Sequence, residues 1–325
     1  MLQQVTIMMK EVNVTGMNNE TINKKYELVM DDSICIMNKH TLYRIKALRD
    51  FSNINKGDLG GYIESENNLS HDGDCWVYDN ARVFGDAIIY DNAIIYGNAI
   101  IYGNAEIYNS AEVFDKTIIC DNARVFGFAE VFDCAEVFGD SRVFGDAEVF
   151  GDARVFDCAR VFGDAEVFDC ARVSGDAEVF GDARVFDCAR VFGDARVFDC
   201  ARVFGCAEVF DNAEVFGYTK VFDCARVFGG AKVFSGACIH GNANICSNAL
   251  IKSNDDYIVI DNIIGIGNDI TTFYKGKNNN AYVNCGCFNG TLDEFISKVK
   301  ETHGDNKHSR DYLAAIEFVK NRFNL

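Results

Sequence analysis

Hydrophobic and polar positions alternate with a strict six-residue period through the middle of the chain. Every sixth residue from Ala81 to Ala249 is Ala, except Thr117, Ser141 and Thr219, and the residue two places later is always Val or Ile. The residue between them is charged in most units, and the fourth is mostly Phe or Tyr. The last two are turn-forming pairs such as Gly-Asp or Asp-Cys. This unit is repeated 29 times without an insertion or deletion, which predicts a β-solenoid.

The alternation indicates which side chains face the core. Residues two apart in a strand share a face, so Ala and Val/Ile point inward, and the charged residue and the aromatic point outward. A helix is excluded because six is not a helical period. Five cysteines, from Cys134 to Cys224, fall on one 18-residue register with Asp152 in the gap. We therefore expect a three-sided all-β helix of about ten 18-residue coils.

The two ends of the chain lack this period and predict different structures. We expect a loose extension over 1–24, a β-rich N-terminal cap over 25–74, the β-helix over 75–254, and an α+β C-terminal cap over 255–325. The cap segments that we expect are strands at Tyr26–Met30, Ile34–Met37 and Leu42–Leu48, a last irregular coil at Tyr257–Ile266, a hairpin of Ile270–Lys275 and Ala281–Cys287, and two helices. The first helix begins with the capping box Thr291–Glu294 and runs to about His303, and the second spans Ser309–Phe323.

Composition narrows the possible partners and the compartment. The net charge is −18, which disfavours binding to nucleic acid or to anionic membranes. No stretch is long enough to span a membrane, and Met1–Val12 lacks the apolar core of a signal peptide. We therefore expect a cytoplasmic protein whose 14 cysteines are reduced. We expect the ladder of Cys170, Cys188, Cys206 and Cys224 to be semi-buried thiols that fill a corner, with metal binding by thiolates or redox linkage as the alternative.

Catalytic and metal-binding candidates are few. The repeats contain one histidine, His240, at an aromatic position, and we interpret it as a surface substitution rather than a catalytic base. We interpret the Asp that follows Gly as a turn residue that bonds its own backbone, not as a calcium ligand. The C-terminal region has two cysteines that would share a face of a strand and two histidines, a set that zinc accepts. These weak metal candidates are Cys285, Cys287, His303 and His308; idle or buried thiols are the alternative. We expect no cofactor.

The outward aromatics sort into three faces when 18 residues make one coil. Face one carries Tyr90, Tyr108, Phe126, Phe144, Phe162, Phe180, Phe198, Phe216 and Phe234. Face two carries Tyr96, Phe114, Phe132, Phe150, Phe168, Phe186, Phe204 and Phe222. Face three is interrupted by Cys120, Ser174 and Cys246. Such ladders either only stabilise the coils by packing, or also form an interface with another copy or another protein. The Phe residues of faces one and two from Phe114 to Phe222 are our candidate interface.

The charged residues beside the ladder of face two are segregated by sign. Acidic residues precede basic ones along it, in the order Glu112, Glu130, Glu148, Glu166, Arg184, Arg202 and Lys220. Like charges stacked on neighbouring coils repel each other. Segregated blocks favour antiparallel pairing of two copies, with the acidic block of one against the basic block of the other.

Motifs at both ends resemble a known family. The N-terminal motifs are Leu42-Tyr-Arg-Ile-Lys-Ala-Leu-Arg-Asp-Phe51, Lys56-Gly-Asp-Leu-Gly-Gly-Tyr62 and Gly73-Asp-Cys-Trp-Val-Tyr78, and the C-terminal one is Cys285-Gly-Cys-Phe-Asn-Gly-Thr-Leu-Asp-Glu-Phe295. With the repeats between them, they resemble the YdcK-like hexapeptide-repeat proteins of bacteria and phages. The resemblance implies a single-stranded left-handed β-helix. It implies no activity, because none is established for the family.

The sequence therefore favours a non-enzymatic scaffold or protein-interaction solenoid, whose partner is itself or another protein. One alternative is a hexapeptide-type transferase with its site in the terminal regions. The other is an acidic inhibitor that mimics DNA. The uninterrupted repeats offer no loop that would build a catalytic pocket, and the interspersed basic residues break up a DNA-like potential.

Overall fold

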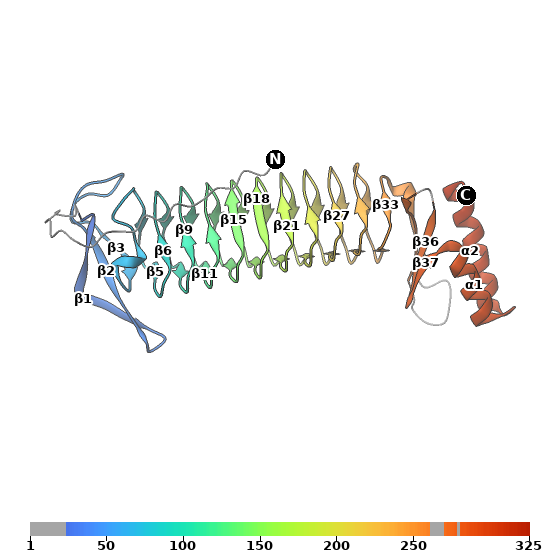
Figure 1. Cartoon of the computed structure of the whole chain (residues 1–325), viewed down its shortest axis with the longest axis horizontal. Coiled ribbons are helices and arrows are strands. Elements are labelled where there is room, and N and C mark those ends of the chain that lie inside the picture. The colour runs from blue at the N-terminus through green and yellow to red at the C-terminus, as the bar shows by residue number, and fades with distance from the viewer. Residues whose placement is uncertain (1–23, 261–269, 278–279) are drawn as a thin grey trace, which may run out of the picture.

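The computed structural model describes residues 24–260, 270–277 and 280–325. It is a long three-sided solenoid with an antiparallel β-hairpin at the N-terminal end and a small α+β region at the C-terminal end (Figure 1). The extension expected over 1–24 lies outside these residues, apart from Lys24. In the part of the chain that the structure describes, no helix has the length and apolarity needed to cross a membrane.

Each side of a coil is a short strand, and strands 18 residues apart pair in parallel. Face one consists of β6 (Ile88–Ile89), β9 (Glu106–Ile107), β12 (Arg124–Val125), β15 (Arg142–Gly145), β18 (Arg160–Gly163), β21 (Glu178–Phe180), β24 (Arg196–Val197), β27 (Glu214–Val215), β30 (Lys232–Val233) and β33 (Leu250–Ile251). Face two consists of β4 (Trp76–Val77), β7 (Ile94–Ile95), β10 (Glu112–Val113), β13 (Glu130–Val131), β16 (Glu148–Val149), β19 (Glu166–Val167), β22 (Arg184–Val185), β25 (Arg202–Val203), β28 (Lys220–Val221) and β31 (Cys238–Ile239).

Face three is the longest stack. It consists of β3 (Leu59–Ile63), β5 (Arg82–Val83), β8 (Ile100–Ile101), β11 (Ile118–Ile119), β14 (Glu136–Val137), β17 (Arg154–Val155), β20 (Arg172–Val173), β23 (Arg190–Val191), β26 (Glu208–Val209), β29 (Arg226–Val227) and β32 (Asn244–Ile245). The solenoid thus has about 11 turns, one more than the repeat count predicts, because the first turn is built from the aperiodic segment that contains β3. The left-handed sense of the coil stays a prediction.

The inward and outward positions are as predicted. Ala147 and Val149 are fully buried, and the same holds for the corresponding residues of nearly every unit. Hydrogen bonds run from each coil to the next; the backbone N–H of Glu130, for example, donates to the carbonyl of Ala147 at 3.0 Å. At one exception to the Ala column, Thr117 is buried and its hydroxyl donates to the carbonyl of Phe114 at 2.7 Å. The core is therefore a dry stack of small and β-branched side chains.

The fifth residue of each unit forms the corner. It has a positive φ in nearly every unit, whether it is Gly, as at Gly151 (φ +70°), or Asp, as at Asp133 (φ +60°). Left-handed backbone favours Gly and, among other residues, Asp and Asn. At the Asp corners the carboxylate accepts a hydrogen bond from the backbone of the following coil, as from Gly151 N–H to Asp133 at 3.2 Å. The bond of the fifth-position Asp thus joins two coils. The expectation that the Asp after Gly bonds its own backbone concerns the sixth position and stays a prediction.

The N-terminal hairpin continues the sheet of face three. It consists of β1 (Tyr26–Ile36) and β2 (His40–Ala47), and β2 pairs antiparallel with β3. The two expected strands before residue 38 form one strand with an irregularity between Val29 and Ser33. The hairpin covers the open edge of the solenoid, which would otherwise expose unpaired backbone.

The C-terminal region contains the expected hairpin and two helices, and two further strands extend the hairpin to a four-stranded antiparallel sheet. The strands are β34 (Tyr257–Ile260), β35 (Thr271–Lys275), β36 (Ala281–Cys285) and β37 (Phe288–Thr291), and the helices are α1 (Leu292–His303) and α2 (Lys307–Phe323). A short 3-10 helix at Glu66–Asn68 precedes β4, and another at Asn254–Asp256 precedes β34. The expected capping box at Thr291 is present. Tyr257–Ile260 pairs with β35 instead of forming a last coil; the rest of that expected coil, up to Ile266, lies outside the described residues.

Candidate interaction surface

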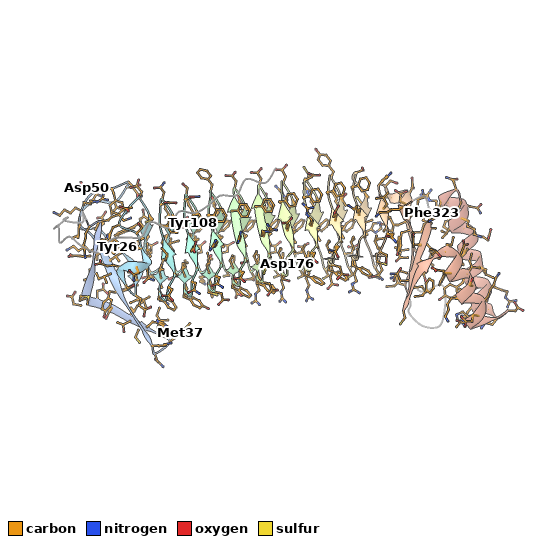
Figure 2. All side chains as sticks on the ribbon, in the orientation of Figure 1. Tyr26, Met37, Asp50, Tyr108, Asp176 and Phe323 are labelled. Carbon is orange, nitrogen blue, oxygen red and sulfur yellow. The ribbon has the colours of Figure 1, made fainter. Side chains whose placement is uncertain are left out.

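Aromatic rings stack along faces one and two as the repeat predicts. Consecutive rings from Tyr90 to Phe234 and from Tyr96 to Phe222 have centroids 4.7–5.1 Å apart and planes within 6° of parallel. Side chains project from the coils along the whole solenoid, and Tyr108 marks face one (Figure 2). The rings are half-buried, since each is covered by the rings above and below it. Stacking therefore stabilises the coils and leaves the ring edges at the surface.

Every Glu on faces one and three is paired with an Arg or Lys on a neighbouring coil, and each of these faces also stacks three Arg in succession. On face one, Glu178 lies between Arg160 and Arg196, at 2.5 and 3.1 Å. On face three, Glu208 lies between Arg190 and Arg226, at 3.7 and 2.9 Å. Opposite charges on neighbouring coils attract each other across the ladder, so these two faces satisfy much of their charge internally.

The charged row of face two has the segregated order that the sequence shows. Its acidic residues lie on consecutive strands and are followed by its basic residues on the next three, in the order Glu112, Glu130, Glu148, Glu166, Arg184, Arg202 and Lys220. Within residues 112–220 of this row, the only ion pair joins Glu166 to Arg184, at 2.7 Å where the blocks meet. Burial, together with Glu112 and Glu148 on the adjoining strands, raises the pKa of Glu130. The row is therefore under like-charge repulsion on both sides of the junction.

Two aromatic side chains at the edge of face two are exposed, unlike the ladder rings. Phe128 is 67% exposed and Tyr218 is 77% exposed. Both occupy the sixth position of their units, two residues before Glu130 and Lys220, where most units have Asp, Asn or Cys. A hollow of about 350 Å³ beside Tyr218 is lined by Asp182, Arg184, Cys200, Arg202, Tyr218 and Lys220. We did not predict these two residues from the sequence; their departure from the consensus of the sixth position was the available signal.

The cysteine corner lies on the other edge of face two. Cys134, Cys170, Cys188, Cys206 and Cys224 are all exposed free thiols. The expectation of semi-buried thiols is therefore wrong, because the sixth residue of the unit points away from the core and Ala alone fills the inside of the corner.

The zinc candidates are not arranged as a site. β36 ends at Cys285, and Gly286 and Cys287 form the turn to β37. Cys285 is consequently buried and Cys287 exposed, so the expectation that they share a face is wrong. The sulfur of Cys285 accepts a hydrogen bond from the Thr271 hydroxyl at 3.1 Å.

The two histidines lie nearby. The rings of His303 and His308 are 5.9 Å apart, and His303 stacks on Tyr312. Among the described residues, no group of three or more His, Cys, Asp or Glu side chains is placed to hold a metal ion. In the repeats, His240 stacks on Phe222 at 5.4 Å, which continues the ladder of face two.

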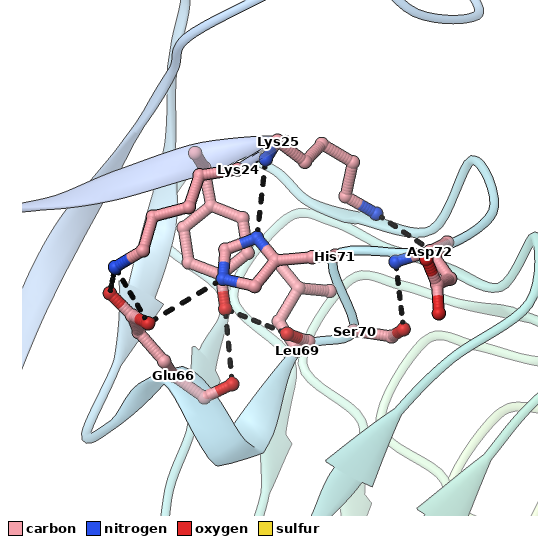
Figure 3. A network of polar contacts seen from close by, with 8 residues as sticks. Lys24, Lys25, Glu66, Leu69, Ser70, His71 and Asp72 are labelled. Carbon is pink, nitrogen blue, oxygen red and sulfur yellow. Dashed lines mark hydrogen bonds and ion pairs between the residues drawn. The ribbon is translucent and has the colours of Figure 1, made fainter. Parts of the chain in front are cut away.

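The N-terminal end contains a buried polar network that closes the first coil (Figure 3). Lys25 is fully buried, and its ammonium donates to the carbonyl of Cys75 at 2.9 Å and contacts the Cys75 thiol at 3.2 Å. Burial lowers the pKa of Lys25. Glu66 pairs with Lys24 at 2.8 Å and with His71 at 3.6 Å. The bond of Lys25 satisfies the carbonyl of Cys75, which has no preceding coil, so we interpret Lys25 as structural.

One comparison with known families is informative. The family model of the YdcK beta solenoid repeat matches residues 87–103. The chain is a YdcK-like β-solenoid repeat protein. The match covers about one turn, and the structure extends the same geometry through about 11 turns. No curated protein matches the chain. The match identifies one YdcK-type repeat within the solenoid and assigns no activity.

Proposed function

We propose that this chain is a non-enzymatic scaffold that binds a protein through face two. The observation that carries the proposal is the contrast between the three faces. Faces one and three pair Glu with Arg from coil to coil, whereas face two keeps its acidic and basic blocks apart. An unpaired row of charges is costly within the chain and is relieved by a partner of complementary charge.

The shape of the face suits a protein partner. The strands of face two from β4 to β31 form one unbroken sheet, and half-buried ring edges run beside the charged row. Aromatic residues and Arg are enriched at protein interfaces, and face two presents both. A transferase site in the repeats is disfavoured, because no loop interrupts the coils and His240 is stacked in a ladder.

Photo-crosslinking from matched positions tests the proposal. A benzoylphenylalanine probe replaces Arg142, Glu148 or Arg154, which occupy the same outward position on faces one, two and three within one coil. The purified chain, and cells that contain it, are then irradiated. We expect a protein adduct from position 148 and little from 142 or 154. Equal yields from all three positions, or no adduct from 148, would contradict the proposal.

A further inference from the structure

Two features of face two are symmetric about the same point. The first is the sign of the charged row, which changes between Glu166 on β19 and Arg184 on β22. Glu148 on β16 and Arg202 on β25 are equally many strands from this point on either side, and so are Glu130 on β13 and Lys220 on β28.

The second feature is the pair of exposed aromatics. Phe128 adjoins β13 and Tyr218 adjoins β28, so both lie three strands from the junction. They belong to the same corner column, which precedes face two. In the residues between them, the other exposed sixth positions of this column are Asp146, Asp164 and Asp182. The charge blocks and the aromatics are independent features of the sequence, yet they share one centre.

A twofold axis through this centre makes the charged row of face two complementary to itself and brings the two exposed aromatics together. The axis lies in the plane of the face, perpendicular to the solenoid axis, between β19 and β22. Rotation about it reverses the order of the strands and keeps each column at its lateral position. β16 then lies opposite β25 of the other copy, and β13 opposite β28. Glu148 therefore faces Arg202, Glu130 faces Lys220, and Phe128 faces Tyr218.

We propose that the partner of face two is a second copy of this chain, bound antiparallel about the axis between Glu166 and Arg184. The proposal rests on the proposed function and names its partner. Each of the three contacts occurs twice in the dimer, once on each side of the axis. The hollow beside Tyr218 spans the layers of β22, β25 and β28, which lie opposite β19, β16 and β13 of the other copy, so it receives Phe128. A parallel pair would set Glu against Glu and Arg against Arg, and such like-charge contacts oppose association.

Charge-reversal variants test the register. One variant carries Glu130→Lys and Glu148→Lys, which makes the row basic on both sides of the junction. The other carries Arg202→Glu and Lys220→Glu, which makes it acidic. The wild-type chain of 36.1 kDa is expected to show twice this mass in light scattering at low ionic strength. Each variant alone is expected to be monomeric, because each would now oppose like charges. An equimolar mixture of the two is expected to regain the dimer mass, since every contact is complementary again.

The recovery in the mixture shows that both variants fold. A control with Arg142→Glu on face one and Arg172→Glu on face three changes the net charge by the same amount as the acidic variant. This control is expected to remain dimeric. A monomeric wild type, dimeric single variants, or a mixture that stays monomeric would overturn the proposal. The proposed function is tested separately. If the chain is monomeric but still forms an adduct from position 148 with a different protein, the scaffold function stands and the antiparallel dimer is overturned. If no adduct forms from that position, both the scaffold function and the dimer are overturned.

Discussion

At the scale of single residues, the corner Asp has two tasks. Asp133 adopts a left-handed backbone and its carboxylate accepts the backbone N–H of Gly151 in the next coil. We predict that Asp133→Ala lowers the free energy of unfolding by about 2 kcal/mol, since it loses the bond and strains the backbone. Asp133→Gly is expected to cost less than Asp133→Ala, because Gly tolerates the positive φ. Urea unfolding measures both values, with Asp146→Ala as an exposed control that should be nearly neutral.

Ladder rings and exposed aromatics also differ in what they stabilise. Phe150 stacks between Phe132 and Phe168, at 4.8 and 4.9 Å, so Phe150→Ala removes two ring contacts. We predict a loss of about 1–3 kcal/mol in the free energy of unfolding. Phe128→Ala is expected to leave the unfolding midpoint unchanged and to weaken the dimer in light scattering. Equal destabilisation by the two variants would contradict this division of roles.

At the scale of elements, the N-terminal cap depends on ionised carboxylates. The hydrogen bond and charge of Lys24 hold the pKa of Glu66 below its usual value of 4.5. A carboxyl whose pKa is lower in the folded state stabilises it above about pH 4.5, and this contribution is lost as the pH falls through the folded pKa. We predict that acidification from about pH 5 to 3 lowers the thermal stability of the wild type more than that of Glu66→Gln. If the melting temperatures of the two proteins fall equally with pH, ionisation of Glu66 does not contribute to the pH dependence of stability.

How far the sequence predicts the elements depends on periodicity. The six-residue period is enough for the buried Ala and Val columns and the outward aromatics, and the 18-residue register of the cysteines adds the three faces and the stacking of the rings. The capping box at Thr291 is also visible from local spacing. β34 and β37 are missed because their partners lie in the C-terminal sheet and no repeat marks them. The inter-coil bond of Asp133 is missed because it joins residues 18 apart, which local turn rules do not consider.

The candidate surface was predicted in part. The acidic and basic blocks of face two can be identified from the sequence once each coil is taken to have three sides. The internal pairing of Glu178 and Glu208 on the other faces needs side-chain geometry, and it is this contrast that makes face two distinctive. Phe128 and Tyr218 depart from the sixth-position consensus in the sequence, and their exposure follows from the fold, which turns this position away from the ladder rings.

At the scale of the whole molecule, the regular spacing of the coils fixes the distances between charged residues on one face. Glu130 and Lys220 are separated by five strand steps, or about 24 Å within one chain, so a zero-length crosslink cannot join them inside a monomer. In the antiparallel dimer, Glu130 of one copy faces Lys220 of the other. Glu214 and Lys232 are an ion pair at 2.7 Å within the chain and provide an internal control.

The most direct test of the account is therefore carbodiimide crosslinking of a mixture of unlabelled and ¹⁵N-labelled chains, read by mass spectrometry. Antiparallel pairing through face two predicts a Glu130–Lys220 crosslink that contains one labelled and one unlabelled peptide. The Glu214–Lys232 crosslink should occur only between peptides of the same label. A sample with the control crosslink and without the Glu130–Lys220 crosslink would contradict antiparallel pairing through face two.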